Sequence, residues 1–304
     1  MNSRLNLSVA FFVLFIAISC KNSTDANQET ILKGNATLLV DATLMPVMED
    51  QVQIFESRYE ATIKMNVQSE AEVIQSLVKD TSSIAVLSRK LNADEIKIFA
   101  NRKIIPKTTP FALDAVALIT NRNSSDTLVA IKDVVNFMKG DFSSKIKGLV
   151  FDNPNSSTVR YMNKLAGLTS IPQKGVFSFG TNNEVIKFVS QNEGMIGVVG
   201  LNWLTQPRPE MQQYVDKVAA LSVKGHNQND FYAPDQNNIA EGKYILAREL
   251  YIVNCQGFSG LGMGFASFVA GDIGQRIILK SGLLPYKVPP RKLSIRKQIS
   301  NDKK

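Results

Sequence analysis

The chain has 304 residues, of which 44% are hydrophobic, so it is long and apolar enough to form one large or two ordinary domains. Its net charge is +8, but seven Lys and Arg residues and one Asp fall in residues 286–304, which leaves the rest nearly neutral. No basic surface interleaved with aromatic residues is evident, which argues against a nucleic-acid-binding protein. With one histidine and no metal-ligand spacing, we expect no metal and no cofactor.

The first 20 residues have the pattern of a signal peptide. Arg4 precedes a nearly unbroken apolar run from Leu7 to Ile18, which is too short to span a membrane. The run ends in Ala17-Ile18-Ser19-Cys20, which resembles the lipobox of bacterial lipoproteins, with cleavage before Cys20 and a lipid on its sulfur. The alternative is an ordinary signal peptide with a chance cysteine. Lipidation of Cys20 would leave Cys255 without a disulfide partner, and we expect Cys255 to be buried.

After a flexible polar tether over residues 21–33, the first third of the chain alternates between strand and helix patterns. This alternation predicts an α/β fold with a parallel core. A hydroxyl residue follows each of the first three strands, namely Thr43, Ser69 and Ser88. In open α/β sheets ligands bind beyond the carboxyl ends of strands. The expected elements are strands over 35–41, 61–68 and 83–88, and helices over 47–59, from 70 through 78, and after Asn92.

Residues 103–121 form a long extended path, which we interpret as the crossing from a first lobe to a second. In the second lobe we expect helices over 131–138 and 183–191, and strands over 149–151, 174–179, 193–200 and 218–223. Residues 224–242 are predicted to form a loop, and residues 244–255 to form strands that return from the second lobe. A glycine-rich turn over 257–264 and a single amphipathic helix over 265–279 complete the predicted fold.

The stretch from Gly148 to Tyr161 is typical of a buried strand, a polar turn and a helix start. Ser156, Ser157 and Thr158 stand at capping positions. A helix start presents unpaired N–H groups and a partial positive charge, so hydroxyls gathered there can form an oxyanion site. One alternative is a well-capped helix and nothing more. Another is a hydrolase with Ser156 or Ser157 as nucleophile, which the missing G-x-S-x-G motif disfavours.

Two motifs in the second half resemble those of the phosphate-specific periplasmic binding proteins of bacterial ABC importers. Gln-Asn-Glu-Gly-Met-Ile-Gly-Val at residues 191–198 matches that family's strand entry, NxGAIGY. Residues 265–285 match its last helix, FxxFxxSxxGQxIIxxxGxxP. The order of elements agrees over residues 35–285. The resemblance implies the type 2 two-lobed fold, an α/β fold with a mixed, mostly parallel sheet in each lobe and no enzymatic activity.

The division of the chain follows from this resemblance. We expect lobe 1 at residues 34–117 and 245–288, lobe 2 at residues 118–244, and a basic tail at residues 289–304. A two-strand hinge is expected near residues 115–119 and 246–253, so that the lobes can close on a ligand. The tail is predicted to be a solvated extension, with contact to anionic lipid or to a partner as the alternative.

The resemblance also implies a ligand site. In that family phosphate is held by an early Ala-Thr turn, a serine after the second strand, a Ser-Asp pair after the third, and an Arg-Ser-Asp-Gly-Ser-Gly-Thr turn that opens a helix. Three departures stand out here: Arg89 replaces the aspartate, Glu70 replaces a glycine, and the arginine before the helix is absent, with Arg160 further along. The matching positions of this chain are Thr43, Ser69, Ser88, Arg89, Asn155, Ser156, Ser157 and Thr158.

We therefore expect a monomeric receptor in the periplasm or cell envelope, anchored to the membrane through a lipid on Cys20. It would bind inorganic phosphate or a related oxyanion between its lobes and deliver it to the permease of an ABC transporter, with no role in nucleic-acid binding. Glu70 and Arg89 motivate an alternative function: a binding-protein fold with a decayed ligand site that acts as a protein-interaction lipoprotein.

Overall fold

The computed structural model describes residues 29–142 and 145–287. The expected signal peptide with Cys20, residues 21–28 of the tether, and the basic tail lie outside the described residues. The strands are β1 Lys33–Asp41, β2 Glu60–Gln68, β3 Ile84–Leu87, β4 Lys107–Asn121, β5 Leu128–Ala130, β6 Gly148–Phe151, β7 Val176–Ser178, β8 Met195–Gly200, β9 Val218–Ala220, β10 Ser222–Lys224, β11 Ala247–Asn254 and β12 Leu284–Pro285.

Helices cover both lobes. The α-helices are α2 Met45–Arg58, α3 Glu70–Lys79, α4 Ala93–Asn101, α5 Ile131–Met138, α6 Ser157–Ala166, α7 Asn182–Gln191, α8 Asn202–Thr205, α9 Gln212–Val215, α10 Gln236–Ala240, α11 Leu261–Val269 and α12 Asp272–Lys280. Two short 3-10 helices are η1 Ala42–Leu44 and η2 Pro209–Met211. No helix in the described ranges is long and apolar enough to cross a membrane.

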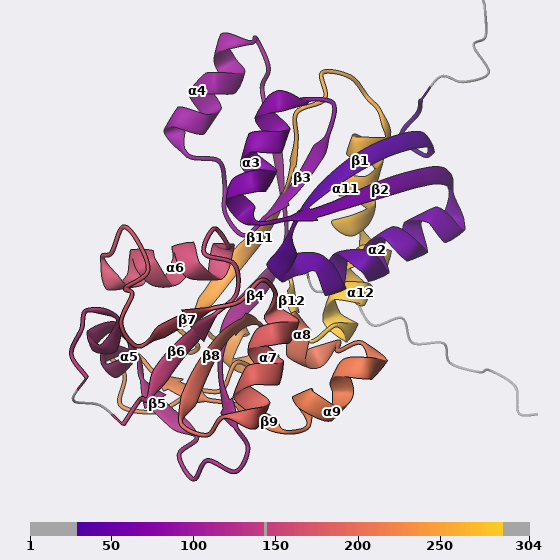
Figure 1. Cartoon of the computed structure of the whole chain (residues 1–304). Coiled ribbons are helices and arrows are strands. Elements are labelled where there is room, and N and C mark those ends of the chain that lie inside the picture. Colours follow the sequence, from indigo (N-terminus) through magenta and orange to yellow (C-terminus); the bar gives the residue numbers. More distant parts are fainter. Residues whose placement is uncertain (1–28, 143–144, 288–304) are drawn as a thin grey trace, which may run out of the picture.

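One sheet of ten strands runs through both lobes in the order β2-β1-β3-β11-β4-β8-β6-β7, with β9 and β12 paired to β4 beside this path. The first part of β4 pairs with β11, and its last residues pair with β8 and β9. Figure 1 shows β1, β2 and β3 in one lobe, β6, β7 and β8 in the other, and β4 with β11 between them. The expected two-lobed α/β fold, with mostly parallel pairing within each lobe, is confirmed.

The first lobe buries both faces of β3 and of the second half of β1, whereas only one residue of the edge strand β2 is buried. Leu38 and Val40 of β1 join the main core, whereas Leu39, which points to the opposite face, packs with α3. Each such side chain contributes roughly 1.5–3 kcal/mol by leaving water. Cys255 is buried in the second of these clusters with Val253, as expected, and burial raises the pKa of its thiol to about 12. This double-sided burial, with the parallel pairing of β2 to β1, fixes the carboxyl ends of three strands at one edge.

In the second lobe, α7 lies directly on the sheet. A Cβ at Gly197 of β8 would come within 2.9 Å of side-chain carbons of Val185 and Val189, so only glycine allows this close approach. Thr181 caps the helix, and its hydroxyl accepts a hydrogen bond from the N–H of Glu184.

Four expected elements differ from the structure. The predicted helix over 265–279 is two helices, α11 and α12, separated at Gly271, and Gly274 lets the second approach the backbone of Val269. The predicted glycine-rich turn over 257–264 is wrong in its second half, because α11 begins at Leu261. The predicted strand over 218–223 is two strands in different sheets. The predicted loop over 224–242 contains α10, which Asp235 caps.

Candidate functional site

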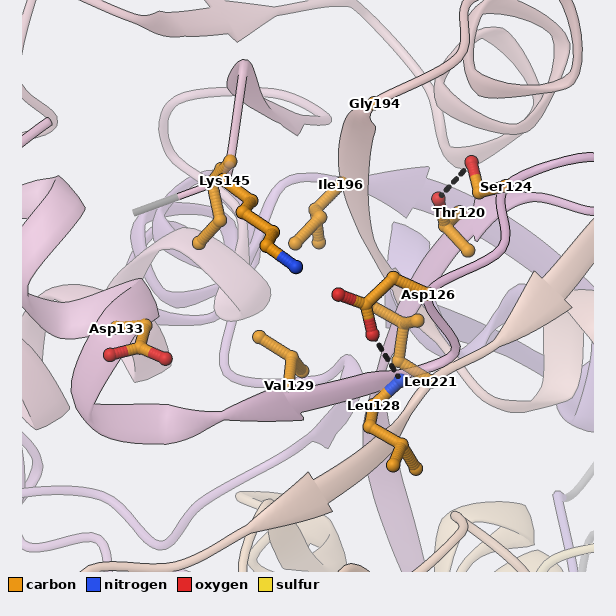
Figure 2. Close-up of a pocket in the computed structure, with 11 residues that line it drawn as sticks. Thr120, Ser124, Asp126, Leu128, Val129, Asp133, Lys145, Gly194, Ile196 and Leu221 are labelled. Atoms are coloured by element: carbon orange, nitrogen blue, oxygen red, sulfur yellow. Dashed lines mark hydrogen bonds between the residues drawn. The ribbon is translucent and has the colours of Figure 1, made fainter. Parts of the chain in front are cut away.

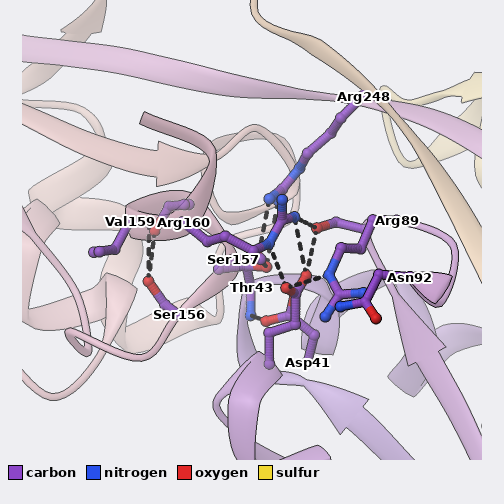
Figure 3. A network of polar contacts seen from close by, with 12 residues as sticks. Asp41, Thr43, Arg89, Asn92, Ser156, Ser157, Val159, Arg160 and Arg248 are labelled. Atoms are coloured by element: carbon purple, nitrogen blue, oxygen red, sulfur yellow. Dashed lines mark hydrogen bonds and ion pairs between the residues drawn. The ribbon is translucent and has the colours of Figure 1, made fainter. Parts of the chain in front are cut away.

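Polar side chains from both lobes and from the strands between them meet where β1, β2 and β3 end and α6 begins. Figure 3 shows many of these side chains pointing toward one another. The carboxyl ends of parallel strands share one sheet edge, which explains why residues far apart in sequence gather here. We call this group the interlobe cluster, and its members are Asp41, Thr43, Glu70, Ser88, Arg89, Asp114, Ser157, Arg160 and Arg248.

Arg248 of β11 and Asp114 of β4 lie directly opposite each other on paired strands. Arg248 Nε and Nη2 donate to the same carboxylate oxygen of Asp114, at 3.1 and 2.8 Å, and both side chains are almost completely buried. The guanidinium also reaches both lobes: Nη1 donates to Ser157 Oγ at 2.9 Å and Nη2 to Thr43 Oγ1 at 3.3 Å. The two hydroxyl oxygens are 2.8 Å apart. One buried cation thus ties the strands between the lobes to a hydroxyl from each lobe.

The electrostatics of the cluster follow from its burial. Although burial works against the charged form, the carboxylates of Asp114 and Asp41 hold the pKa of Arg248 above its usual value. Burial, with the charge of Glu70, raises the pKa of Asp41 to about 6, while Arg248 opposes this shift. One oxygen of Asp41 accepts from the N–H of Thr43 at 3.1 Å, and the other has no hydrogen-bond partner among the described residues.

Glu70 is the first residue of α3 and is only 2% exposed. Its carboxylate accepts hydrogen bonds from Ser88 Oγ at 3.0 Å and from Arg89 Nε at 3.0 Å. From the other lobe, Arg160 donates through both Nε and Nη2 to the two oxygens, the second at 3.1 Å. Arg160 Nη2 also lies 3.2 Å from Ser88 Oγ. The carboxylate therefore receives hydrogen bonds from both lobes at one buried point.

Arg89 has a second acidic partner. Its Nη1 and Nη2 donate to the two oxygens of Glu95 in α4 at 2.7 and 2.8 Å, a two-bonded arrangement that fixes the plane of the guanidinium. The Glu95 carboxylate also caps α4 by accepting from the N–H of Asn92. Arg89 is thus held on its own lobe, with its Nε turned toward Glu70.

The other sequence-predicted residues face different partners. Ser156 Oγ and Thr158 Oγ1 both donate to Asp152 Oδ1, at 2.5 and 2.6 Å, inside the second lobe. Ser69 Oγ donates to Glu72 at 2.6 Å, in the capping box of α3. Asn155 is exposed, and its carbonyl oxygen accepts from the N–H of Ala71 across the lobes at 3.4 Å. The structure therefore brings Thr43, Ser88, Arg89 and Ser157 together, and places Ser69, Ser156 and Thr158 in local networks.

Five members of the cluster were not predicted as site residues, namely Asp41, Glu70, Asp114, Arg160 and Arg248. Glu70 and Arg160 were noted only as departures from the family pattern, and the other three were not singled out. The signal for the ion pair between the two strands is Asp114 within the apolar run 111–119 of β4, since a buried charge requires a partner, together with Arg248 near the start of the apolar strand β11.

The cluster offers several hydrogen-bond donors for an anion. Among the described residues, neither the Ser156 nor the Ser157 hydroxyl bonds to a histidine, and His226 is exposed on a turn after β10. In the same ranges no group of three or more His, Cys, Asp or Glu residues could hold a metal ion. What the arrangement can do is bind negatively charged oxygens through guanidinium and hydroxyl groups.

A separate pocket of about 490 Å³ lies in the second lobe (Figure 2). Its lining includes the apolar side chains of Val129, Ile196 and Leu221 and the charged side chains of Asp126, Asp133 and Lys145. No predicted site residue and no member of the interlobe cluster lines it. Its charged side chains are exposed, so it lacks the buried, convergent charged groups of the interlobe cluster.

Solved structures with the same fold include binding proteins of transporters. A putative phosphate ABC transporter substrate-binding protein with bound phosphate, from Clostridium perfringens, superposes with a TM-score of 0.70 at 20% identity over 84% of this chain and 100% of that one. An ABC-type phosphate transport receptor from Vibrio cholerae gives 0.62 at 18% identity, over 83% and 100%. The CcmR regulatory domain from Synechocystis in complex with 2-PG gives 0.52 at 13% identity, over 78% and 96%. These neighbours share the fold, which serves more than one function.

A search of curated protein sequences gave no match. The sequence model for the PBP superfamily domain matches residues 25–272, which is most of the chain. The two transport-protein neighbours are a substrate-binding protein and a transport receptor rather than enzymes, in agreement with the expectation for this chain. The two lobes, the shared β4 strand and this match agree, and the chain therefore belongs to the PBP superfamily.

Proposed function

We propose that the protein is an extracytoplasmic receptor that binds a small oxyanion, phosphate above all, between its lobes and delivers it to the permease of an ABC transporter. The observation that supports this most directly is the environment of Glu70. Its carboxylate, two oxygens that share a negative charge, accepts hydrogen bonds from Ser88, Arg89 and Arg160 at a buried point where the lobes meet. Guanidinium and hydroxyl donors that fit carboxylate oxygens also fit phosphate oxygens.

A second set of donors lies on the other side of the cluster. Arg248 bonds to the hydroxyls of Thr43 and Ser157, one from each lobe. Those hydroxyls can turn to donate to an anion, because a hydroxyl is both donor and acceptor. The N-termini of α3 and α6, at Glu70 and Ser157, add partial positive charge. An oxyanion held here would contact both lobes at once, which is the condition for ligand-driven closure.

The anchor is the second part of the proposal. Cys20 directly follows the apolar run and precedes a polar tether, so a lipid on its sulfur would hold the folded body at a membrane. Mass spectrometry of the membrane-extracted protein should find an N-terminal lipidated Cys20. In Cys20→Ser, the signal peptide should no longer be cleaved before residue 20 and no lipid should be attached. A mature wild-type protein whose N-terminus is not Cys20 would contradict the anchor.

Calorimetry tests oxyanion binding. The full chain in detergent micelles is titrated with phosphate, arsenate, sulfate and molybdate, with chloride as the control anion. Saturable heat with phosphate, and none with chloride, is the expected result. Absence of heat with all four oxyanions would contradict the receptor function.

A second candidate function is favoured by the same carboxylate. Because Glu70 already takes the hydrogen bonds of Arg160 and Ser88, the fold could be retained without a ligand, as an envelope lipoprotein that binds a protein partner. The two functions differ in one genetic test. A double substitution of Ser156 and Ser157 by alanine should abolish the cellular role of a receptor and leave that of a protein-interaction lipoprotein intact.

A further inference from the structure

Glu70 differs from every other acid of the interlobe cluster in bonding to both lobes. Asp114 pairs with Arg248 on the neighbouring strand, and Asp41 accepts from the backbone N–H of Thr43 in its own lobe. Glu70 is carried by α3 of the first lobe, whereas Arg160 is carried by α6 of the second. The ion pair between them is nearly buried on the Glu70 side, where the side chain is 3% exposed. A buried, hydrogen-bonded pair of this kind is worth more than a surface pair.

The lobes touch close to this pair as well. Thr43 Oγ1 of η1 meets Ser157 Oγ, and the indole Nε1 of Trp203 in α8 donates to the Thr43 carbonyl oxygen at 3.0 Å. The N–H of Ala71, next to Glu70, donates to the carbonyl of Asn155. The bonds that Glu70 makes to Arg160 therefore belong to a set of contacts that holds the two lobes against each other.

We propose that Glu70 is an internal ligand of the interlobe cluster: its carboxylate holds the lobes together when no oxyanion is bound, and it must leave Arg160 and Ser88 before an oxyanion can take their hydrogen bonds. This inference rests on the proposed oxyanion-receptor function and adds a residue that sets its affinity. A ligand binds only the fraction of molecules in which Glu70 has been displaced, so its apparent affinity is lowered by that fraction.

The geometry gives the reason for displacement. The two oxygens of Glu70 already accept four hydrogen bonds, from Ser88 Oγ, from Arg89 Nε and from two nitrogens of Arg160. A second anion placed beside this carboxylate would meet like charge in a buried setting where repulsion is weakly screened. Exchange of one anion for the other on the same donors avoids this repulsion.

The experiment compares Glu70→Gln with the wild-type full chain in detergent micelles. The matched control is Glu60→Gln, because Glu60 forms an exposed ion pair with Lys33 on the neighbouring strand, within the first lobe and outside the cluster. Phosphate affinity is measured by calorimetry. The chain has a single tryptophan, Trp203, so its emission reports on the contact with Thr43. Glu70→Gln should bind phosphate about tenfold more tightly or better, and its emission without phosphate should be red-shifted and return on phosphate addition.

Each other outcome contradicts a different claim. Equal or weaker phosphate binding by Glu70→Gln, with unchanged Trp203 emission, would overturn the inference about Glu70. Phosphate binding by the wild type would still support the proposed function. Absence of oxyanion binding by both proteins would overturn the proposed function itself. The Glu60→Gln control should match the wild type in both measurements, and a tenfold gain there would overturn a specific role for Glu70.

A second variant separates release of the lobes from loss of fold. Arg160→Gln breaks the same pair from the other side and also removes a donor to the oxyanion. It should show the red-shifted emission of Glu70→Gln but weaker phosphate binding than the wild type. Far-UV circular dichroism checks that both variants are folded. Opposite changes in affinity from the two sides of one ion pair would not arise from a general loss of structure, and changes in the same direction would overturn the inference.

Discussion

Two groups of hydroxyls and carboxylates lie next to each other at the start of α6, and they connect different parts of the molecule. In the first, Asp152 accepts from Ser156, from Thr158 and from the amide of Asn182, all within the second lobe. In the second, Ser157 bonds outward to Thr43 and Arg248. Similar residue types thus stabilise one lobe in the first group and couple two lobes in the second. The comparison teaches that the hydroxyls at a helix start must be assigned one by one.

The largest effect is expected from breaking the buried ion pair of the interlobe cluster. Arg248→Met leaves Asp114 buried without its cation, and we expect the free energy of unfolding to fall by about 3–5 kcal/mol. Denaturant unfolding measures this loss. Arg208→Met, which breaks an exposed pair with Glu49, is the control and should change stability by less than about 1 kcal/mol.

A double variant sharpens the interpretation of that loss. Asp114→Leu combined with Arg248→Met replaces both charges by apolar groups and should recover part of the stability, because no buried charge is left unpaired. Oxyanion binding should not recover, since the guanidinium that reaches Thr43 and Ser157 is gone. A double variant as unstable as Arg248→Met would show that the ion pair is not the origin of the loss.

The group around Asp152 should respond mainly in stability. Asp152→Ala leaves the buried hydroxyls of Ser156 and Thr158 and the amide of Asn182 without their acceptor, and we expect a loss of about 2–4 kcal/mol. Thermal or denaturant unfolding measures it. Asp133→Ala, at an exposed acid in the first turn of α5, is the control. A loss of stability no larger than that of the control would contradict the assignment of this group to the interior of the lobe.

The adjacent serines test the comparison most directly. Ser157→Ala should weaken phosphate binding about tenfold, which corresponds to one hydrogen bond to a charged group. Ser156→Ala removes the cap of α6 and should cost about 1 kcal/mol of stability with little change in affinity. Calorimetry and unfolding are measured on both variants. Equal losses of affinity would show that the helix start acts as a whole and that the two groups are not distinct.

The sequence predicted the fold more fully than the cluster, for a physical reason. Alternating strand and helix patterns are local, and so is the cap at Ser156, which the structure confirms. Glu70 and Arg160 are 90 residues apart, and Asp114 and Arg248 are 134 apart, so their pairing depends on strand order and register. The three hydroxyls of residues 156–158 are alike in sequence. Successive helical residues point in different directions, and only the packing of α6 decides which hydroxyl faces the other lobe.

The partners of the charged residues also depend on how the lobes pack against each other. Sequence analysis identified Glu70 as a departure from the family pattern but could not show that it meets Arg160, because helix spacing alone does not place two lobes relative to each other. The split of the last predicted helix has a similar origin. The apolar spacing continues across Gly271, and the close approach of Gly274 to the end of α11 turns the chain.

We also predict a pH dependence of stability at Asp41, which distinguishes the interlobe cluster from the exposed surface. Burial, then the charge of Glu70, raises the pKa of Asp41 from 3.8 to about 6, so the folded protein favours the protonated form. The group contributes stability that is full below its ordinary pKa and is lost as the pH rises through about 6.

The free energy of unfolding is measured between pH 4 and 7 for the wild type and Asp41→Asn. The wild type should lose roughly 2 kcal/mol relative to the variant as the pH rises, because the rise in the pKa of Asp41 from 3.8 to about 6 spans most of this range. Because Glu70 contributes to the shift, the same pair in a Glu70→Gln background should show the loss at lower pH. A difference that stays constant with pH would mean that Asp41 is ionised throughout and that the cluster does not restrain its charge.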